Sequence, residues 1–98
     1  MRVSATPEAT SFIVQRGGRL FVWATDHRCC RGGRFTVLDA DTVPPAKPRP
    51  SFARVEAVGF TVFLWPGPRS IPEELVVEMR GRRRRRVEAF WNGCVYVV

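Results

Sequence analysis

Helical spacing is confined to one short segment near the start of the chain, which limits the folds that the chain can form. Four residues follow the i, i+3, i+4, i+7 spacing of one helix face: Ala9, Phe12, Ile13 and Arg16. Thr6 suits the N-cap and Pro7 the first helical position, and Gly17-Gly18 can end the helix in a left-handed conformation. The sequence therefore predicts one helix over about residues 7–16.

The rest of the chain consists of short runs of aromatic and β-branched residues that glycine and proline interrupt, a pattern typical of strands and turns. Asn92-Gly93 predicts a type I′ turn before the last run, and the prolines over residues 43–50 predict a long extended loop. Residues 25–33 are predicted to connect the first two strands. The predicted strands are 20–24, 34–39, 52–58, 60–65, 75–79, 87–91 and 94–98. We expect an α+β domain that is mostly β, with one N-terminal helix and about seven short strands in a small sandwich or partial barrel.

Length and composition favour a single folded domain over residues 1–98. The chain has 98 residues, 45% hydrophobic and 11% aromatic, which suffices for one small core and does not fit a disordered polycation. No run approaches the roughly 18 apolar residues of a membrane span, and no apolar segment follows Arg2, so we expect neither a membrane protein nor a secreted one. Three cysteines, two of them adjacent, suit a reduced, cytoplasmic protein better than a disulfide framework.

Positive charge is concentrated in a predicted hairpin, residues 80–86. The chain has a net charge of +7, and 15 of its 16 cations are arginine. Six of them could contact the phosphates of a nucleic acid: Arg80, Arg82, Arg83, Arg84, Arg85 and Arg86. Successive strand residues point to opposite faces, so only a bulged or mobile hairpin would bring them to one phosphate backbone. The alternative is a solvated turn that keeps strand edges from pairing with other chains.

One histidine and three cysteines are the residues best suited to bind a soft metal, because thiolate and imidazole are ligands of zinc, copper(I) and iron–sulfur clusters. Cys29 and Cys30 are adjacent and no Cys-x-x-Cys pair is present, which disfavours chelation of one ion within one chain. The alternative is that these cysteines and His27 are ordinary loop residues and that Cys94 is a small core residue, shielded from alkylation. Neighbouring arginines favour thiolate, so we expect Cys29 or Cys30 to react faster than Cys94.

Motifs of the common catalytic and phosphate-binding sites are absent from the sequence. No G-x-S-x-G elbow is present, and Cys30 and His27 have no orienting third group other than Asp26. The two glycine pairs, Gly17-Gly18 and Gly32-Gly33, do not fit the phosphate-binding patterns G-x-x-x-x-G-K-[ST] and G-x-G-x-x-G. We therefore expect that the protein is not an enzyme.

The order of the segments is similar to that of a known family. That family opens with a short strand and a T-P-x-A helix, as Val3–Ala9 does, and places a C-S-G-[FY] loop between two strands, where Cys29–Phe35 stands here. Three later strand motifs are similar to Val58–Leu64, Glu74–Glu78 and Gly93–Val97. On this pattern the chain resembles the HesB-like A-type iron–sulfur carriers, although it has no counterpart of their C-terminal C-G-C-G tail.

The resemblance implies a β-rich, barrel-like domain that acts as a divergent A-type carrier-like binding or scaffold module, with cluster binding weakened or lost. Cys29 or Cys30 takes the place of the family's first ligand, and His27 is a further candidate, so an iron–sulfur cluster or iron would be held there. A homodimer or a protein partner would complete the site. The alternative function is a basic nucleic-acid-binding module that contacts phosphates through the hairpin Arg80–Arg86.

Overall fold

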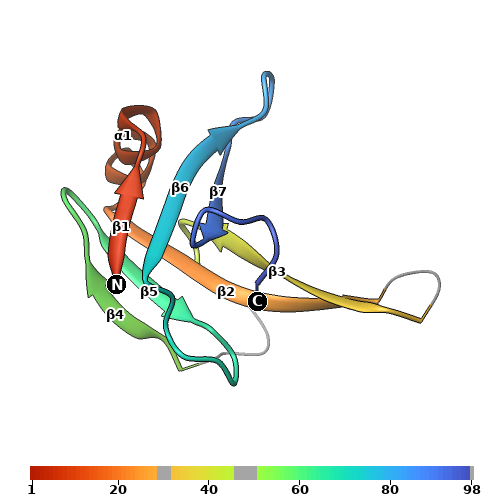
Figure 1. Ribbon diagram of the computed structural model, residues 1–98. Coiled ribbons are helices and arrows are strands. Elements are labelled where there is room, and N and C mark those ends of the chain that lie inside the picture. The colour runs from red at the N-terminus through yellow and green to blue at the C-terminus, as the bar shows by residue number, and fades with distance from the viewer. Residues whose placement is uncertain (29–31, 46–50, 98) are drawn as a thin grey trace.

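The computed structural model describes residues 1–28, 32–45 and 51–97, and this part of the chain contains one helix and seven strands (Figure 1). In chain order they are β1 (Arg2–Ala5), α1 (Pro7–Gln15), β2 (Arg19–Arg28), β3 (Arg34–Asp41), β4 (Ala53–Glu56), β5 (Thr61–Trp65), β6 (Glu74–Arg80) and β7 (Arg86–Trp91). The predicted α+β class, mostly β with one N-terminal helix, is confirmed. None of the described helical structure is long and apolar enough to cross a membrane.

The helix begins and ends at the residues that its capping signals predict. Thr6 is the N-cap, its hydroxyl accepts a hydrogen bond from the Ala9 N–H at 3.2 Å, and Pro7 occupies the first turn. Beyond Gln15 the chain turns through Gly17 and Gly18, both with positive φ, and the Gly18 N–H donates to the Ile13 carbonyl at 2.9 Å. Local signals therefore set the bounds of this element.

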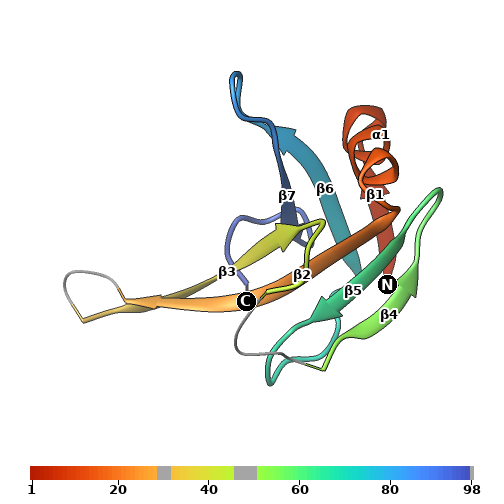
Figure 2. The ribbon, with the colours of Figure 1, turned by 180° about the vertical axis from the view of Figure 1, so that it is seen from behind.

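The strands form two sheets that enclose one core. In the first sheet, with the order β1-β6-β7, β1 runs parallel to β6 and β7 is antiparallel to it. In the second, with the order β3-β2-β5-β4, the central strands β2 and β5 are parallel and the outer strands antiparallel to them. The helix α1 packs against β6 and β2 and covers one end of the space between the sheets (Figure 2).

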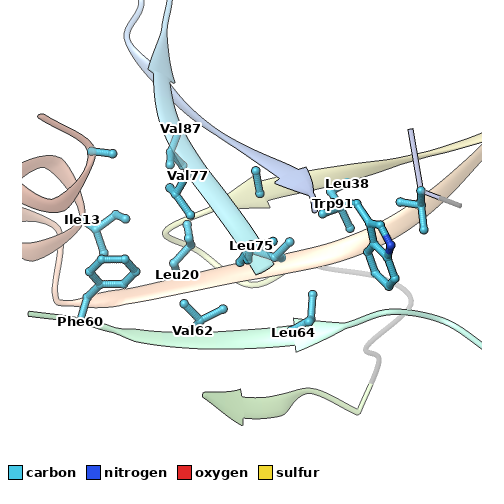
Figure 3. Close-up of a cluster of buried hydrophobic side chains, with 14 residues drawn as sticks. Ile13, Leu20, Leu38, Phe60, Val62, Leu64, Leu75, Val77, Val87 and Trp91 are labelled. Atoms are coloured by element: carbon cyan, nitrogen blue, oxygen red, sulfur yellow. The ribbon is translucent and has the colours of Figure 1, made fainter. Parts of the chain in front are cut away.

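The core lies between the facing sides of the two sheets (Figure 3). Leu20, Val62 and Leu64 from the four-stranded sheet face Leu75 and Val77 from the three-stranded sheet, and all five side chains are fully buried. Ile13 of the helix and Phe60 close one end of this cluster, while Leu38 and Trp91 close the other. Along β5 and β6 the buried positions alternate, because every second side chain of a strand points to the face that meets the core.

One predicted strand boundary is wrong because of long-range pairing. The segment 25–33 was predicted as a connection, but β2 continues to Arg28, so that His27 lies in a strand. The Thr25 hydroxyl donates to Asp39, and the Thr36 hydroxyl donates to Asp26, across the β2–β3 pair. These cross-strand hydrogen bonds stabilise a polar strand extension that has no apolar alternation.

The predicted strand 94–98 does not form in the described residues up to Val97. Asn92 and Gly93 both have positive φ and make the predicted tight turn, after which Cys94 bridges Trp91. The chain then leaves β7 and reaches β3, where the Val97 N–H donates to the Thr36 carbonyl at 2.8 Å. Six named strands follow the helix rather than about seven, and β1 precedes it, where the family resemblance places a strand. In the proline-rich loop, residues 46–50 lie outside the described residues.

Candidate functional sites on two hairpins

Two hairpins project from the core in different directions (Figure 1). The β6–β7 hairpin, here called the arginine hairpin, carries residues 80–86 at its tip, and the β2–β3 hairpin, here called the arm, carries residues 28–34. Each ends in a cross-strand pair of like charges: Arg80 lies opposite Arg86, and Arg28 lies opposite Arg34. Because like charges directly opposite each other destabilise a strand pair, both tips have positive charge that other groups must offset.

In the arginine hairpin, carboxylates engage three of the six predicted phosphate-binding residues. Glu88 pairs with both Arg80 and Arg86, at 3.3 and 3.2 Å, and Arg85 forms an ion pair with Glu8 at the start of the helix. The other three, Arg82, Arg83 and Arg84, are exposed, and no described carboxylate lies within ion-pair distance of them. Free guanidinium groups are therefore confined to the outermost turn.

The tip of this hairpin is a tight turn rather than a continued strand. Gly81 has a φ of +91°, and a Cβ at that position would lie 2.2 Å from the Arg84 carbonyl oxygen. The backbone thus folds back on itself between Gly81 and Arg84, where only glycine fits without displacement. As a result, the exposed arginines do not lie in a regular strand, where successive side chains would point to opposite faces. They can therefore contact a single phosphate backbone.

The predicted metal ligands are not brought together in the described part of the chain. Cys29 and Cys30 lie outside the described residues, and His27 is an exposed residue of β2 whose ring stacks on Phe35, with centroids 5.3 Å apart. Cys94 is exposed at the turn after β7, which contradicts the prediction that it is a shielded core residue. Within residues 1–28, 32–45 and 51–97, no group of three or more His, Cys, Asp or Glu residues is placed to hold a metal ion.

The arm contributes to a pocket that the sequence does not predict. It has a volume of about 450 Å³, and its lining includes Arg34, Phe35, Arg69 and Tyr96. The Thr36 hydroxyl orients one wall, because it accepts a hydrogen bond from Arg69 Nη2 at 3.1 Å while donating to Asp26. Neither Arg69 nor Tyr96 is near the arm in sequence, so no local pattern could have predicted this pocket.

Comparisons with known proteins leave the family unassigned. No family model matches the sequence, and no curated protein matches it. One solved structure is similar, the crystal structure of SufA from Escherichia coli, described as involved in the biosynthesis of iron–sulfur clusters. The likeness covers 99% of this chain and 93% of the SufA chain, with 14% sequence identity and a TM-score of 0.47. Function must therefore be argued from this chain's own residues.

Proposed function

We propose that the protein is a non-enzymatic binding or scaffold module whose soft-metal site lies at Cys29 and Cys30 and is weaker than that of a complete A-type iron–sulfur carrier. The observation that carries the proposal is the position of the flanking residues. Arg28 and His27 before the cysteines, and Gly32 and Arg34 after them, are all exposed at the end of a hairpin that extends beyond the core. Thiolates joined to such exposed strand ends suit an exchangeable soft metal or cluster.

The other candidate donors of the chain explain why we expect weak binding of the metal or cluster. Cys94 lies at the end of β7, and His27 is engaged in stacking with Phe35. The described residues form no cluster of three or more donors, and we infer that a second chain or a partner completes the ligand set. This supports a module that binds iron or a cluster incompletely on its own.

Reconstitution with iron and sulfide under anaerobic conditions tests this proposal. We expect weak, substoichiometric cluster absorbance that Cys29→Ser or Cys30→Ser removes and that the matched control Cys94→Ser leaves unchanged. Strong stoichiometric absorbance dependent on Cys29 or Cys30 would overturn the weakened site in favour of a full carrier. Absorbance that none of the three substitutions changes would overturn the site itself.

The geometry of the arginine hairpin favours a second candidate function, the binding of nucleic-acid phosphates. Arg82, Arg83 and Arg84 are exposed beyond the arginines that Glu8 and Glu88 neutralise. Contacts from three arginines to duplex DNA would release about three counterions, so log affinity should fall with log salt with a slope of roughly −3 and with little sequence preference.

Anisotropy titrations with labelled duplex DNA at about 50 and 200 mM salt test this second candidate. The double variant R83Q/R84Q should weaken binding and reduce the slope by about two. The control R16Q/R19Q removes the same charge from the end of α1 and the start of β2, and should change the slope much less. Equal losses in the two variants would show that only net charge matters and would reject the hairpin as the binding site.

A further inference from the structure

Three exposed aromatic rings lie in contact along the arm. His27 and Phe35 are directly opposite each other in the β2–β3 pair and stack at an interplanar angle of 17°. Tyr96, from the segment after β7, meets Phe35 edge to face, with ring centroids 5.8 Å apart. Phe35 remains 37% exposed and Tyr96 57% exposed, so both present ring surface to the solvent. The arm thus has a preformed aromatic surface that the described residues leave uncovered.

Positive charge surrounds these rings. Arg34 and Arg69 line the pocket beside Phe35 and Tyr96, and Arg28 lies opposite Arg34. Among the described residues, no carboxylate lies within ion-pair distance of these three arginines. Asp26 also lines the pocket, but it is engaged by the Thr36 hydroxyl. Two guanidinium groups, Arg34 and Arg69, against the one carboxylate of Asp26 give the pocket lining an excess of positive charge.

We propose that this pocket binds an unpaired nucleotide, with its base stacked on Tyr96 beside Phe35 and its phosphate on Arg34 and Arg69. Every base has an aromatic face, and stacking on aromatic side chains beside cations is how single-stranded nucleic acids are held without sequence preference. The volume of about 450 Å³ falls in the range of small-ligand sites. Thr36 holds Arg69 in place at 3.1 Å, so this cation is already oriented towards a phosphate before binding.

The site is distinct from the arginine hairpin. The hairpin tip offers guanidinium groups alone, whereas the pocket combines cations with rings, and the two hairpins project in different directions (Figure 1). The pocket should therefore discriminate strands with bases from strands without them, which a phosphate contact cannot do. This difference makes the two proposals separable in one assay.

Anisotropy titrations with a labelled oligothymidylate and an abasic strand of equal length provide the test. We expect the strand with bases to bind about 5- to 150-fold more tightly, the range for one stacked base. Tyr96→Leu should bring the two affinities close together, and Tyr96→Trp, which keeps a ring, should preserve the difference. R83Q/R84Q should weaken both strands equally and leave their ratio unchanged. Equal affinity of the unsubstituted protein for the two strands would overturn the proposal.

Nuclear magnetic resonance of the unsubstituted protein gives a second test that no folding defect can obscure. His27 and Tyr96 are the only histidine and the only tyrosine in the chain, so the ring protons of each residue type come from a single residue. A stacked base should shift the Tyr96 signals, and the His27 signals through Phe35. Shifts with a mononucleotide would identify a free nucleotide as a ligand, whereas shifts with the oligonucleotide alone would identify a single strand. No shift with either ligand would overturn the proposal.

Discussion

The arginine hairpin and the arm have the same charge arrangement and offset it in different ways. Both end in opposed arginines, yet in the arginine hairpin Glu88 lies between the pair and accepts contacts from both. The arm has no such ion pair among its described residues, and aromatic rings and a Thr36 hydroxyl surround its cations instead. The opposed arginines of the hairpin thus share a carboxylate within the protein, and its free charge is confined to the tip residues Arg82–Arg84, whereas the opposed arginines of the arm have no ion pair among the described residues and retain positive charge that an anionic ligand can offset.

Substitution of Leu75 in β6 or of Leu20 in β2 tests whether the two hairpins share one core. Both side chains are fully buried in the same cluster, so Leu→Ala at either position should lower the free energy of unfolding by about 2–5 kcal/mol. Urea denaturation followed by tryptophan fluorescence measures the loss. Val14→Ala on the exposed side of the helix serves as the control, with an effect within about 0.5 kcal/mol. A separate early transition in either core variant would mean that the hairpins unfold independently.

Gly81 and Gly32 allow the tips of the two hairpins to be compared by the same substitution. Gly81→Ala places a Cβ against the Arg84 carbonyl as well as at an unfavourable φ, so we expect a loss of about 1–3 kcal/mol in the free energy of unfolding. Gly32 on the arm has a similar φ of +82°, and no atom of the described residues would lie within 4 Å of a Cβ there, so Gly32→Ala should cost only about 1 kcal/mol. Equal losses in the two variants would show that steric contact at the arginine tip is relieved by movement.

What the sequence predicts well is local, and the helix is the clearest case. Thr6, Pro7 and the glycine pair after the helix act within a few residues of the backbone groups that they cap, so their effect does not depend on the rest of the fold. The Asn92-Gly93 turn is predicted correctly for the same reason. The charged tip 80–86 also follows from the sequence, because glycine and consecutive arginines fit a solvated turn between two strands.

What the sequence does not predict depends on partners far along the chain. β1 pairs with β6, where Ser4 lies opposite Val76, and the polar end of β2 is stabilised by hydroxyl contacts with β3 that become visible only once the register is known. The arm pocket needs Arg69 and Tyr96, which arrive from two other segments. Sequence analysis could name His27 and Phe35 as arm residues but had no means to place them beside these two.

Glu88→Gln tests the role assigned to the carboxylate in the arginine hairpin. The substitution frees Arg80 and Arg86, so affinity for duplex DNA should rise at low salt and the salt slope should become steeper by up to about two. Stability should fall by less than about 1 kcal/mol, because the arginine side chains of both ion pairs are largely exposed. Glu56→Gln on β4 makes the same change of net charge outside both hairpins and is the control. If both variants gain affinity equally, Glu88 acts through net charge and not through its two partners.

The reactivity of Cys94, at the base of the arginine hairpin, can be compared with that of Cys29 and Cys30. Substitution of Cys94 is also expected to have the smallest effect on stability. Its side chain is exposed after the tight turn and packs into no core cluster, so Cys94→Ser should change the free energy of unfolding by no more than about 0.5 kcal/mol. Because exposure gives an alkylating reagent access, native Cys94 should be labelled at a rate close to that in urea. Mass spectrometry of each labelled cysteine measures both this rate and those of Cys29 and Cys30, which we expect to exceed it because neighbouring arginines favour thiolate. Strong protection of Cys94 in the native protein would contradict the exposed turn, and slower labelling of both arm cysteines would remove the support for a reactive thiol site on the arm.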